Sequence, residues 1–331
     1  MRFRQIPIEQ VDWAALDKYE DRTPEQRKPW LDYLTAVGAG KPVVAMLEDR
    51  GSELGWFTGM RKTIVGVPVL GSPLKGYNTT YMGLNLVPGV SRTQALRALS
   101  RFAIFDQKCA YLELSDVYCD PECARGAGYE VVSSGGFVTD LHLPEEELFN
   151  RMTSACRRCI RKAEKVGLVV EEAKPDGFAA EFHAQLTDVF AHQGLKPTYS
   201  EERVAKLIEH VHPSGELLLL RARTDSGQSI ATGIFYGFGK YSGFWGNGSI
   251  RSMLQLRPNQ AIHWYALRYW KARGVRWHHW GGGGEYKEAY GPDALSYCRQ
   301  FKSAIPGLAK LRKPAIDTYY AIRTWHTRLR G

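Results

Sequence analysis

The sequence lacks the motifs that would assign it to a large class of hydrolases or nucleotide-binding enzymes. It has no P-loop, no GxSxG and no HExxH pattern, and no pair of carboxylates stands out for hydrolysis. No run of apolar residues reaches the length of a membrane span. The stretch MRFRQIPIEQVDW contains Arg2 and Arg4 but no apolar segment, so it does not resemble a secretory signal. We therefore expect a cytoplasmic protein without an integral membrane segment.

Cysteine is also scarce, with six in 331 residues. Four of them form two close pairs, Cys119 with Cys123 and Cys156 with Cys159, which raises the hypothesis of a zinc site. The second pair lies at positions i and i+3 of a predicted helix, on one face with Met152, where cysteine serves as a small apolar filler. We therefore predict reduced thiols, no metal site and no cofactor.

Positive charge is in excess. The chain has 44 Lys and Arg against 35 Asp and Glu, which gives a net charge of +9. Such an excess favours an anionic partner, which could be a nucleic acid, a phosphorylated ligand or an acidic membrane surface. The apolar content of 44% is sufficient for large cores, and the length suits two domains or one large domain.

Two parts of the chain show a similar order of predicted elements. The first, after a helical entry over residues 1–38, alternates strands with a helix over residues 91–107, and the second repeats this order. The repetition predicts a duplicated α+β fold, in which mixed sheets are flanked by helices. We place the domains at residues 1–135 and 136–310. A basic helix over residues 311–331 would follow, either packed on its own domain or lying on a phosphate-bearing surface.

The stretch over residues 241–307 has the richest pattern. Tyr241 to Trp245 reads as a strand, Pro258 opens a helix, and a second strand over residues 275–280 leads directly into four glycines at 281–284. Because glycine has no Cβ, this turn lets the backbone approach a ligand closely. We predict a substrate site that includes Tyr241, Trp245, Gly283 and Gly284, with a simple connecting loop as the alternative.

Three further features fit an anionic or polar substrate. Arg257 and Asn259 lie at the start of the predicted helix, where free backbone N–H groups suit a phosphate. Lys196 precedes a proline in the loop GLKPTYS, and a lysine on a stiff loop can act as a point charge for an anion. Tyr77 belongs to the loop over residues 71–86, which could form the wall of a cleft. For Lys196 and Tyr77, the alternative is a solvated surface loop without a role in binding.

One predicted helix, within residues 144–166, is strongly basic. Its charges could contact the backbone of a polyanion such as RNA, and a solvated face is the alternative. The residues assigned to this contact are Arg157, Arg158, Arg161 and Lys162.

Two aromatic-lysine pairs follow the second strand, Tyr286-Lys287 and Phe301-Lys302. A lysine beside an aromatic ring in a cleft can stabilise negative charge that develops on a carbonyl oxygen. The adjacent His278 and His279 could act as a base or bind a metal, but neighbours on a strand face opposite ways, so at most one faces a cleft.

Several of these motifs resemble the Fem-type (FemAB-like) peptidyltransferases. The shared segments are WLDYL, LGSPLKGYNTTYMG, SACRRCIRKAEKVGLVV, GLKPTYSEERV, LRPNQAIHWYAL and a strand that ends in GGGG and is followed by SYCRQFKSAIPG. The resemblance implies two GNAT-like domains and the transfer of an aminoacyl group from tRNA to an amine. It also implies that Lys302 sits at the reacting carbonyl and that Lys196 contacts a phosphate of the acceptor.

The chain departs from the family at three points. The strand before the glycines reads WHHW, where the family usually has an acidic residue, and the long helical hairpin of the larger Fem enzymes is absent. The segment RPNQAI also lacks the glycines of the loop with which GNAT enzymes bind acyl-CoA. We predict an amide-forming aminoacyltransferase, with Lys302 as the first choice for the catalytic lysine and Lys287 as its rival. The alternatives are an acyl-CoA-dependent N-acyltransferase and a non-catalytic tRNA- or polyanion-binding protein.

Overall fold

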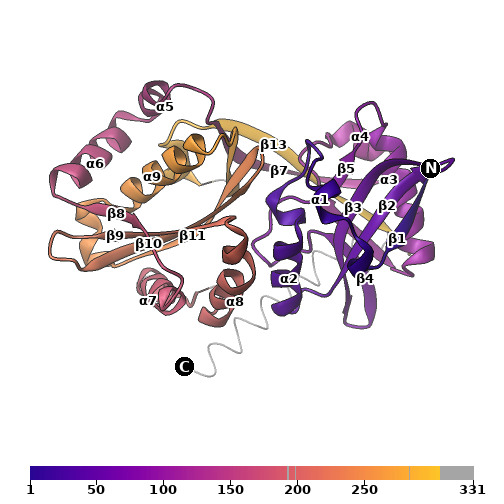
Figure 1. The fold of residues 1–331 in the computed structure, drawn as a ribbon, viewed down its shortest axis with the longest axis horizontal. Helices are drawn as coiled ribbons and strands as arrows, with labels where there is room; N and C mark the ends of the chain where they lie inside the picture. The colour runs from indigo at the N-terminus through magenta and orange to yellow at the C-terminus, as the bar shows by residue number, and fades with distance from the viewer. Residues whose placement is uncertain (192–193, 198, 283, 306–331) are drawn as a thin grey trace. The chain divides into compact units, whose positions relative to one another are not determined.

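The computed structural model describes residues 1–191, 194–197, 199–282 and 284–305, which form two compact units (Figure 1). Unit 1 contains Met1–Asp12, Ala39–Ser133 and the described part of the segment that begins at Tyr297, and unit 2 contains Trp13–Gly38 and Ser134–Ser296. The chain thus passes from unit 1 to unit 2 close to residue 135, but each unit also takes in a segment from elsewhere in the sequence. The predicted helix over residues 311–331 lies outside the described residues.

Unit 1 is built on a mixed sheet whose strands run in the order β1-β2-β3-β4-β6-β13, with β5 paired to β3. The strands β4 and β6 are parallel, whereas the pairs β1-β2, β2-β3, β3-β4, β3-β5 and β6-β13 are antiparallel. The strands are β1 (Arg2–Ile6), β2 (Lys41–Asp49), β3 (Ser52–Ile64), β4 (Val67–Ser72), β5 (Gly83–Leu86), β6 (Tyr111–Ser115) and β13 (Asp293–Ser303).

Helices α3 (Arg92–Arg101) and α4 (Pro121–Gly126) contribute to the core of unit 1. Leu96 and Leu99 of α3 are buried against the sheet, and Ser91 caps the helix by accepting a hydrogen bond from the Gln94 amide at 3.4 Å. The predicted helical entry is wrong at its start, because residues 2–6 form β1. Local pattern did not reveal this strand, which is stabilised by pairing with β2 and by Phe3 packing against Phe57.

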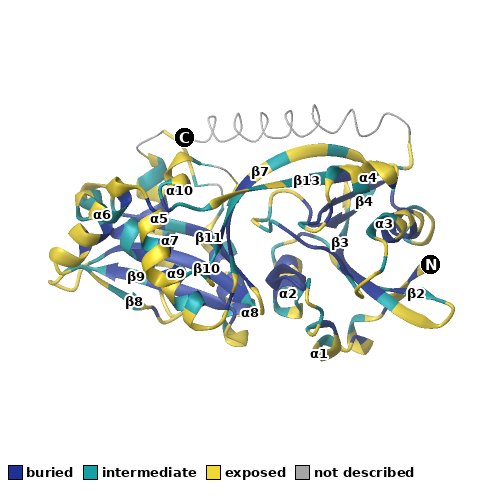
Figure 2. Cartoon of the chain, turned by 90° about the horizontal axis from the view of Figure 1, so that it is seen from above, coloured by how far each residue is buried: buried dark blue, intermediate teal, exposed yellow. Residues whose placement is uncertain are grey.

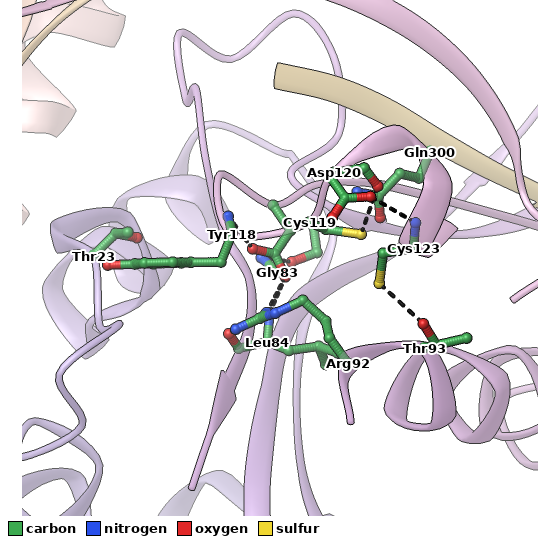
Figure 3. A network of polar contacts seen from close by, with 12 residues as sticks. Thr23, Gly83, Leu84, Arg92, Thr93, Tyr118, Cys119, Asp120, Cys123 and Gln300 are labelled. Atoms are coloured by element: carbon green, nitrogen blue, oxygen red, sulfur yellow. Dashed lines mark hydrogen bonds and ion pairs between the residues drawn. The ribbon is translucent and has the colours of Figure 1, made fainter. Parts of the chain in front are cut away.

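A polar network fixes the connection from β6 to α4 (Figure 3). Asp116 directly follows β6, forms an ion pair with Arg92, and accepts a hydrogen bond from the Tyr118 amide at 2.9 Å. Arg92 also donates to the Leu84 carbonyl at 3.2 Å. A Cβ at Gly83 would lie 2.6 Å from the Asp116 Cβ, so this packing requires glycine. The buried charge of Asp116 is therefore fully engaged in holding unit 1 together.

In unit 2 the strands run in the order β7-β12-β11-β10-β9-β8. The first residues of β7 belong to unit 1, and the first residues of β13 belong to unit 2. The strands of unit 2 are β7 (Glu130–Asp140), β8 (Val169–Glu172), β9 (Leu217–Arg223), β10 (Ser229–Phe238), β11 (Tyr241–Ser249) and β12 (Trp277–Gly282). Its helices are α1 (Trp13–Leu16), α2 (Lys28–Ala36), α5 (Glu145–Arg151), α6 (Ser154–Lys165), α7 (Phe178–Ala191), α8 (Glu201–Val211), α9 (Pro258–Ala272) and α10 (Glu285–Glu288).

The helices of unit 2 cover both faces of its sheet. In Figure 1, α6 and α9 lie on one face, and α7 and α8 on the other. Strand β10 is buried along nearly its whole length (Figure 2), with Phe235 packed in the cluster that also holds Ile262 and Trp270 of α9. The single helix expected within residues 144–166 is instead two helices. The break occurs at Met152, which is extended, and Thr153 then caps α6 by accepting from the Cys156 amide at 3.2 Å.

Each unit contains the same type of crossover connection. In unit 1 the parallel strands β4 and β6 are joined through α3, and in unit 2 the parallel strands β11 and β12 are joined through α9. The predicted α+β architecture with mixed sheets and flanking helices is thereby confirmed. None of the helices in the described ranges is long and apolar enough to cross a membrane.

Candidate active site

The parallel strands of unit 2 separate within a few residues of their start. Over the part of the chain that the structure describes, β11 and β12 pair only where Tyr241–Gly243 lie beside Trp277–His279. The later part of β11 stays paired with β10, while β12 stays paired with β7, from Trp277 opposite Asp140 to Gly282 opposite Gly136. The partner register of β11 also skips Trp245, which marks a β-bulge. Diverging strands leave backbone N–H and C=O groups that a ligand can reach.

Lys287 lies next to this opening. Its side chain is buried, and its Nζ donates to the carbonyl oxygens of Trp280 at 2.7 Å and Gly282 at 2.6 Å. The ammonium also lies 5.9 Å from the centroid of the Phe244 ring. Burial lowers the pKa of Lys287 below its ordinary value. Because an ammonium has three N–H groups, one remains for a substrate atom.

Two histidines line the same region from α9 and β12. The ring of His263 is buried, with centroids 4.7 Å from Phe244 and 5.2 Å from Trp280. Burial, and then the charge of Lys287, lower the pKa of His263 to about 3, so its ring is neutral near pH 7. The Nδ1 of His278 lies 2.9 Å from the Ser242 hydroxyl. Within the described ranges, His263 Nδ1 and His278 Nε2 are buried and have no hydrogen-bond partner, which makes both ring atoms candidates for contact with an ordered water or a ligand.

The predicted helix start is where the sequence placed it. Pro258 opens α9, and Arg257 before it is exposed with a left-handed backbone at φ 65°. Asn259 donates to the Ser249 hydroxyl at 3.5 Å, while its buried Oδ1 has no partner among the described residues. Asn259 and His263 are four residues apart and therefore share one face of α9. His263 was not among the residues predicted from the sequence.

The aromatic residues predicted on β11 lie toward α7 and α8. The ring of Trp245 is buried, 4.7 Å from that of Tyr199 and 6.2 Å from that of Phe182. Tyr241 is buried, with its ring 5.9 Å from that of His279. A Cβ at position 246 would lie 2.6 Å from the Tyr199 hydroxyl, so glycine is required there. Tyr199, which the sequence analysis did not single out, links the loop of Lys196 to the bulge of β11.

The remaining predicted residues are dispersed. Lys196 is exposed between α7 and α8, and Gly284 immediately precedes α10. Gly283 lies outside the described residues. Lys302 and Tyr77 belong to unit 1, where the Nζ of Lys302 donates to the Gly128 carbonyl at 2.6 Å. Tyr77 accepts a hydrogen bond from Lys62 Nζ at 2.8 Å. The two candidate catalytic lysines are therefore in different units.

Helix α6 presents its cations away from the core. Cys156 and Ile160 are buried, whereas Arg158, Arg161 and Lys162 are exposed. Arg157 is half-buried and donates to backbone carbonyls, and Arg161 lies over the Phe149 ring at 5.2 Å. No ion pair to an acidic side chain is present for these four cations within the described part of the chain.

The cysteines show no metal-binding arrangement. Cys156 lies beside Met152, with the sulfur atoms 4.0 Å apart, and burial raises the pKa of its thiol to about 12. Cys119 is buried and Cys123 is half-buried. Over the residues that the structure describes, no three His, Cys, Asp or Glu side chains are grouped so that they could hold a metal ion.

Comparison with known proteins then identifies the fold. Residues 150–290 match the family model described as an acetyltransferase (GNAT) domain. The crystal structure of FemX superposes with a TM-score of 0.73 at 12% identity, covering 90% of this chain and 97% of FemX. L-PGS from Bacillus licheniformis gives a TM-score of 0.55 at 12% identity, with 85% and 89% coverage. A tandem GNAT protein from the clavulanic acid biosynthesis pathway gives 0.53 at 14%, with 92% and 99% coverage. No curated protein sequence matches.

These comparisons confirm two expectations from the sequence. The chain has a tandem GNAT-like fold, and the resemblance to Fem-type proteins holds for the fold over nearly the whole chain. The matched GNAT domain contains α6, β11, α9 and β12, and hence the opening described above. Residues 150–290 are therefore similar to an acyltransferase-type domain, and the candidate site lies within these residues.

Proposed function

We propose that the protein forms amide bonds by moving an aminoacyl group from aminoacyl-tRNA to an amine. The acceptor would be an amine-bearing molecule, such as a cell-wall precursor, a peptide or a small metabolite, and it could carry a phosphate. The observation that carries the proposal is the opening between β11 and β12 in a FemX-like fold, where Lys287, His263 and His278 offer polar atoms to a ligand.

The reaction requires a stabilised oxyanion more than a nucleophilic side chain. The amine adds to the ester carbonyl, a C–N bond forms, and the carbonyl oxygen becomes negative. The C–O bond then breaks, and the amine loses a proton as the hydroxyl of the tRNA leaves. The free N–H of Lys287 can donate to the oxyanion, because two backbone carbonyls already fix the ammonium. His263 binds protons too weakly to act as a base near pH 7, so we assign it an orienting hydrogen bond.

Two features favour tRNA over acyl-CoA as the donor. The start of α9 carries Pro258 and Asn259, not the glycines with which GNAT enzymes approach a diphosphate. In the same unit, the exposed cations of α6 suit the RNA backbone, and we propose that Arg157, Arg158, Arg161 and Lys162 contact it. Lys196 and Arg257, both exposed, would bind phosphates of the substrates, while Trp245 and Tyr241 would contribute to substrate binding from the face of β11 that is covered by α7.

One observation favours a second candidate, an acyl-CoA-dependent N-acyltransferase. The matched family model is that of an acetyltransferase domain, and it spans the elements that form the opening. In that case the same strands would hold a thioester in place of an aminoacyl ester. The oxyanion chemistry proposed for Lys287 would be unchanged.

The donor can be tested directly with the full chain. Total tRNA charged with radiolabelled amino acids, or radiolabelled acetyl-CoA, is incubated with a panel of amine acceptors. We expect label to move from tRNA to an acceptor, and RNase to abolish the transfer. Transfer only from acetyl-CoA would establish the second candidate. Binding of tRNA without any transfer would instead support a non-catalytic RNA-binding protein.

A further inference from the structure

Three cationic side chains line one pocket in unit 1, away from the elements used above. The pocket has a volume of about 380 Å³ and lies between α3 and the end of β13. Its lining residues are Arg97, Ser100, Arg101, Ala127 and Lys302. The two arginines are exposed on successive turns of α3, whereas Ser100 and Ala127 are buried and form the floor. Three like charges in one pocket repel each other unless an anion lies between them.

None of the three cations is neutralised by the surrounding protein. Arg97 donates to the Gly126 carbonyl at 2.7 Å, Lys302 to the Gly128 carbonyl at 2.6 Å, and Arg101 to the Met1 carbonyl at 3.5 Å. Within the described ranges, none of them forms an ion pair with a carboxylate. A guanidinium has five N–H groups and an ammonium has three, so most of these donors stay available to a ligand.

The backbone places Lys302 at the pocket. Gly128 has a φ of 80°, and a Cβ there would lie 2.9 Å from the Lys302 Nζ. Glycine therefore permits the ammonium to reach the Gly128 carbonyl. Lys302 in β13 pairs with Leu112 of β6, and this pairing fixes the backbone from which the lysine side chain extends. The lysine is thus held in place before any ligand binds, and this lowers the entropic cost of binding.

We infer that this pocket binds a phosphate group. Arginine forks match phosphate oxygens with paired hydrogen bonds, and the lysine adds a point charge. The floor is formed by small side chains, and the volume is sufficient for a diphosphate. Two sources share this chemistry, a free nucleoside diphosphate and the backbone of RNA. The inference goes beyond the proposed transfer reaction, because it depends on residues of unit 1 and on no step of the chemistry.

Titration calorimetry of the full chain tests the inference. The probes are inorganic pyrophosphate, a nucleoside diphosphate and uncharged tRNA, and the variants are Arg97→Ala, Arg101→Ala and Lys302→Met. Loss of one charge-assisted contact should weaken binding of the bound probe about 10- to 100-fold. Lys41→Met is the matched control, because Lys41 is an exposed lysine of unit 1 at the start of β2 and does not line the pocket. It should bind like the unchanged protein.

The outcomes separate the two sources and can overturn the inference. Binding of the small diphosphates that is lost in the three variants assigns the site to a free nucleotide. Binding of tRNA alone, with a lower salt dependence in the variants, assigns it to an RNA backbone. No binding of any probe, variants that bind like the unchanged protein, or an equal loss in Lys41→Met would each overturn it.

The experiment also separates this site from the proposed reaction. Lys302→Met removes a hydrogen bond to Gly128, and Arg97→Ala removes one to Gly126. If these changes lower the melting temperature below the temperature of the assay, Arg101→Ala decides the matter, because its hydrogen bond to a backbone carbonyl is the longest of the three. Lys287→Met should abolish transfer and leave pyrophosphate binding intact.

Discussion

The two lysines that follow an aromatic residue near the end of the described chain have opposite surroundings. Lys287 in unit 2 is buried, held by two backbone carbonyls and close to aromatic rings, and burial lowers its pKa. Lys302 in unit 1 is half-buried and shares a pocket with Arg97 and Arg101. An isolated, desolvated charge interacts strongly with one developing negative charge, whereas a cluster of hydrated cations suits a polyanionic ligand. We therefore propose a role in the chemistry for Lys287 and a role in anion binding for Lys302.

Two sets of buried polar groups, one in each unit, have different surroundings. In unit 1, the buried Asp116 is neutralised by Arg92 and by backbone amides. In unit 2, the buried ring nitrogens of His263 and His278 have no partner in the described ranges. Unit 1 also has buried atoms without a partner, such as Gln300 Oε1, so the lack of a partner does not by itself distinguish the units. We propose catalysis in unit 2 because two neutral histidine rings lie there close to Lys287.

The largest expected effect is that of Lys287→Met. Removing one donor to an oxyanion typically lowers turnover about 100- to 1000-fold, and the KM of both substrates should change little. Turnover is measured with the charged-tRNA assay described above. Lys302→Met is the matched substitution in the other unit, and we expect it to lower turnover much less at saturating substrate. The reverse order of effects would show that Lys302, the first choice from the sequence, is the oxyanion donor.

The second effect concerns α6. The double variant Arg158→Glu and Arg161→Glu should weaken tRNA binding by about tenfold or more, and should reduce the slope of log affinity against log salt by roughly 0.9 per lost contact. Filter binding over a range of salt concentrations measures both quantities. Lys41→Glu with Lys174→Glu reverses the same number of charges on other exposed segments and should have a smaller effect. Affinity that is independent of salt would contradict an RNA contact at α6.

The third effect is a loss of stability in acid that is confined to unit 2. The pKa of His263 is about 3 and that of His279 about 4 in the folded protein, against 6.5 when unfolded. Between these values the unfolded chain binds more protons, so the free energy of unfolding falls as the pH falls below 6.5. Each buried histidine contributes about 1.4 kcal/mol per pH unit over this range.

Hydrogen exchange at pH 7 and pH 5 locates this acid effect. Protection factors, which correct each exchange rate for its intrinsic pH dependence, should fall in the core of unit 2 at the lower pH, while those of unit 1 should change little, since the described residues of unit 1 contain no histidine. His263→Phe keeps an aromatic ring in the same packing and should reduce the pH dependence. An equal fall of the protection factors in both units would show that the effect does not arise from the buried histidines.

Much of the fold could be predicted from local patterns. The helix that starts at Pro258, the strand that leads into the glycines and the repeated order of elements all appear in the structure. The strand at residues 2–6 and the break at Met152 could not be predicted in this way. The strand depends on pairing with β2, and the break on a cap at Thr153 inside an otherwise periodic segment. Residues 13–38 belong to unit 2, where α2 packs against α8, and this long-range contact cannot be predicted from local patterns.

The strands and helix around the candidate site could be predicted from the sequence, but several of its residues could not. Glycines, a helix start and aromatic residues indicated the region around β11 and β12. Lys287 and Asn259 lie beside β12 and at the start of α9, whereas the Trp245 ring packs against Phe182 of α7. His263 and Tyr199 were missed, because a histidine in an apolar helix and a tyrosine in a loop have no distinctive spacing by themselves. The division of Lys287 and Lys302 between two units could not be read from the sequence, since it depends on β13 pairing with β6.

The smallest expected effect is that of removing metal ions. A zinc ligand must be a thiolate, but burial raises the pKa of Cys156 to about 12, so its thiol stays protonated near pH 7. Cys156 contacts Met152, and Cys159 is half-buried without a third ligand among the described residues. A chelator should therefore leave the melting temperature of the purified protein unchanged, and elemental analysis should find far less than one zinc per chain. Cys156→Ala should cost stability only through the lost packing volume. Stoichiometric zinc, or a chelator-induced drop in melting temperature, would show instead that the cysteine pairs of the two units bind metal.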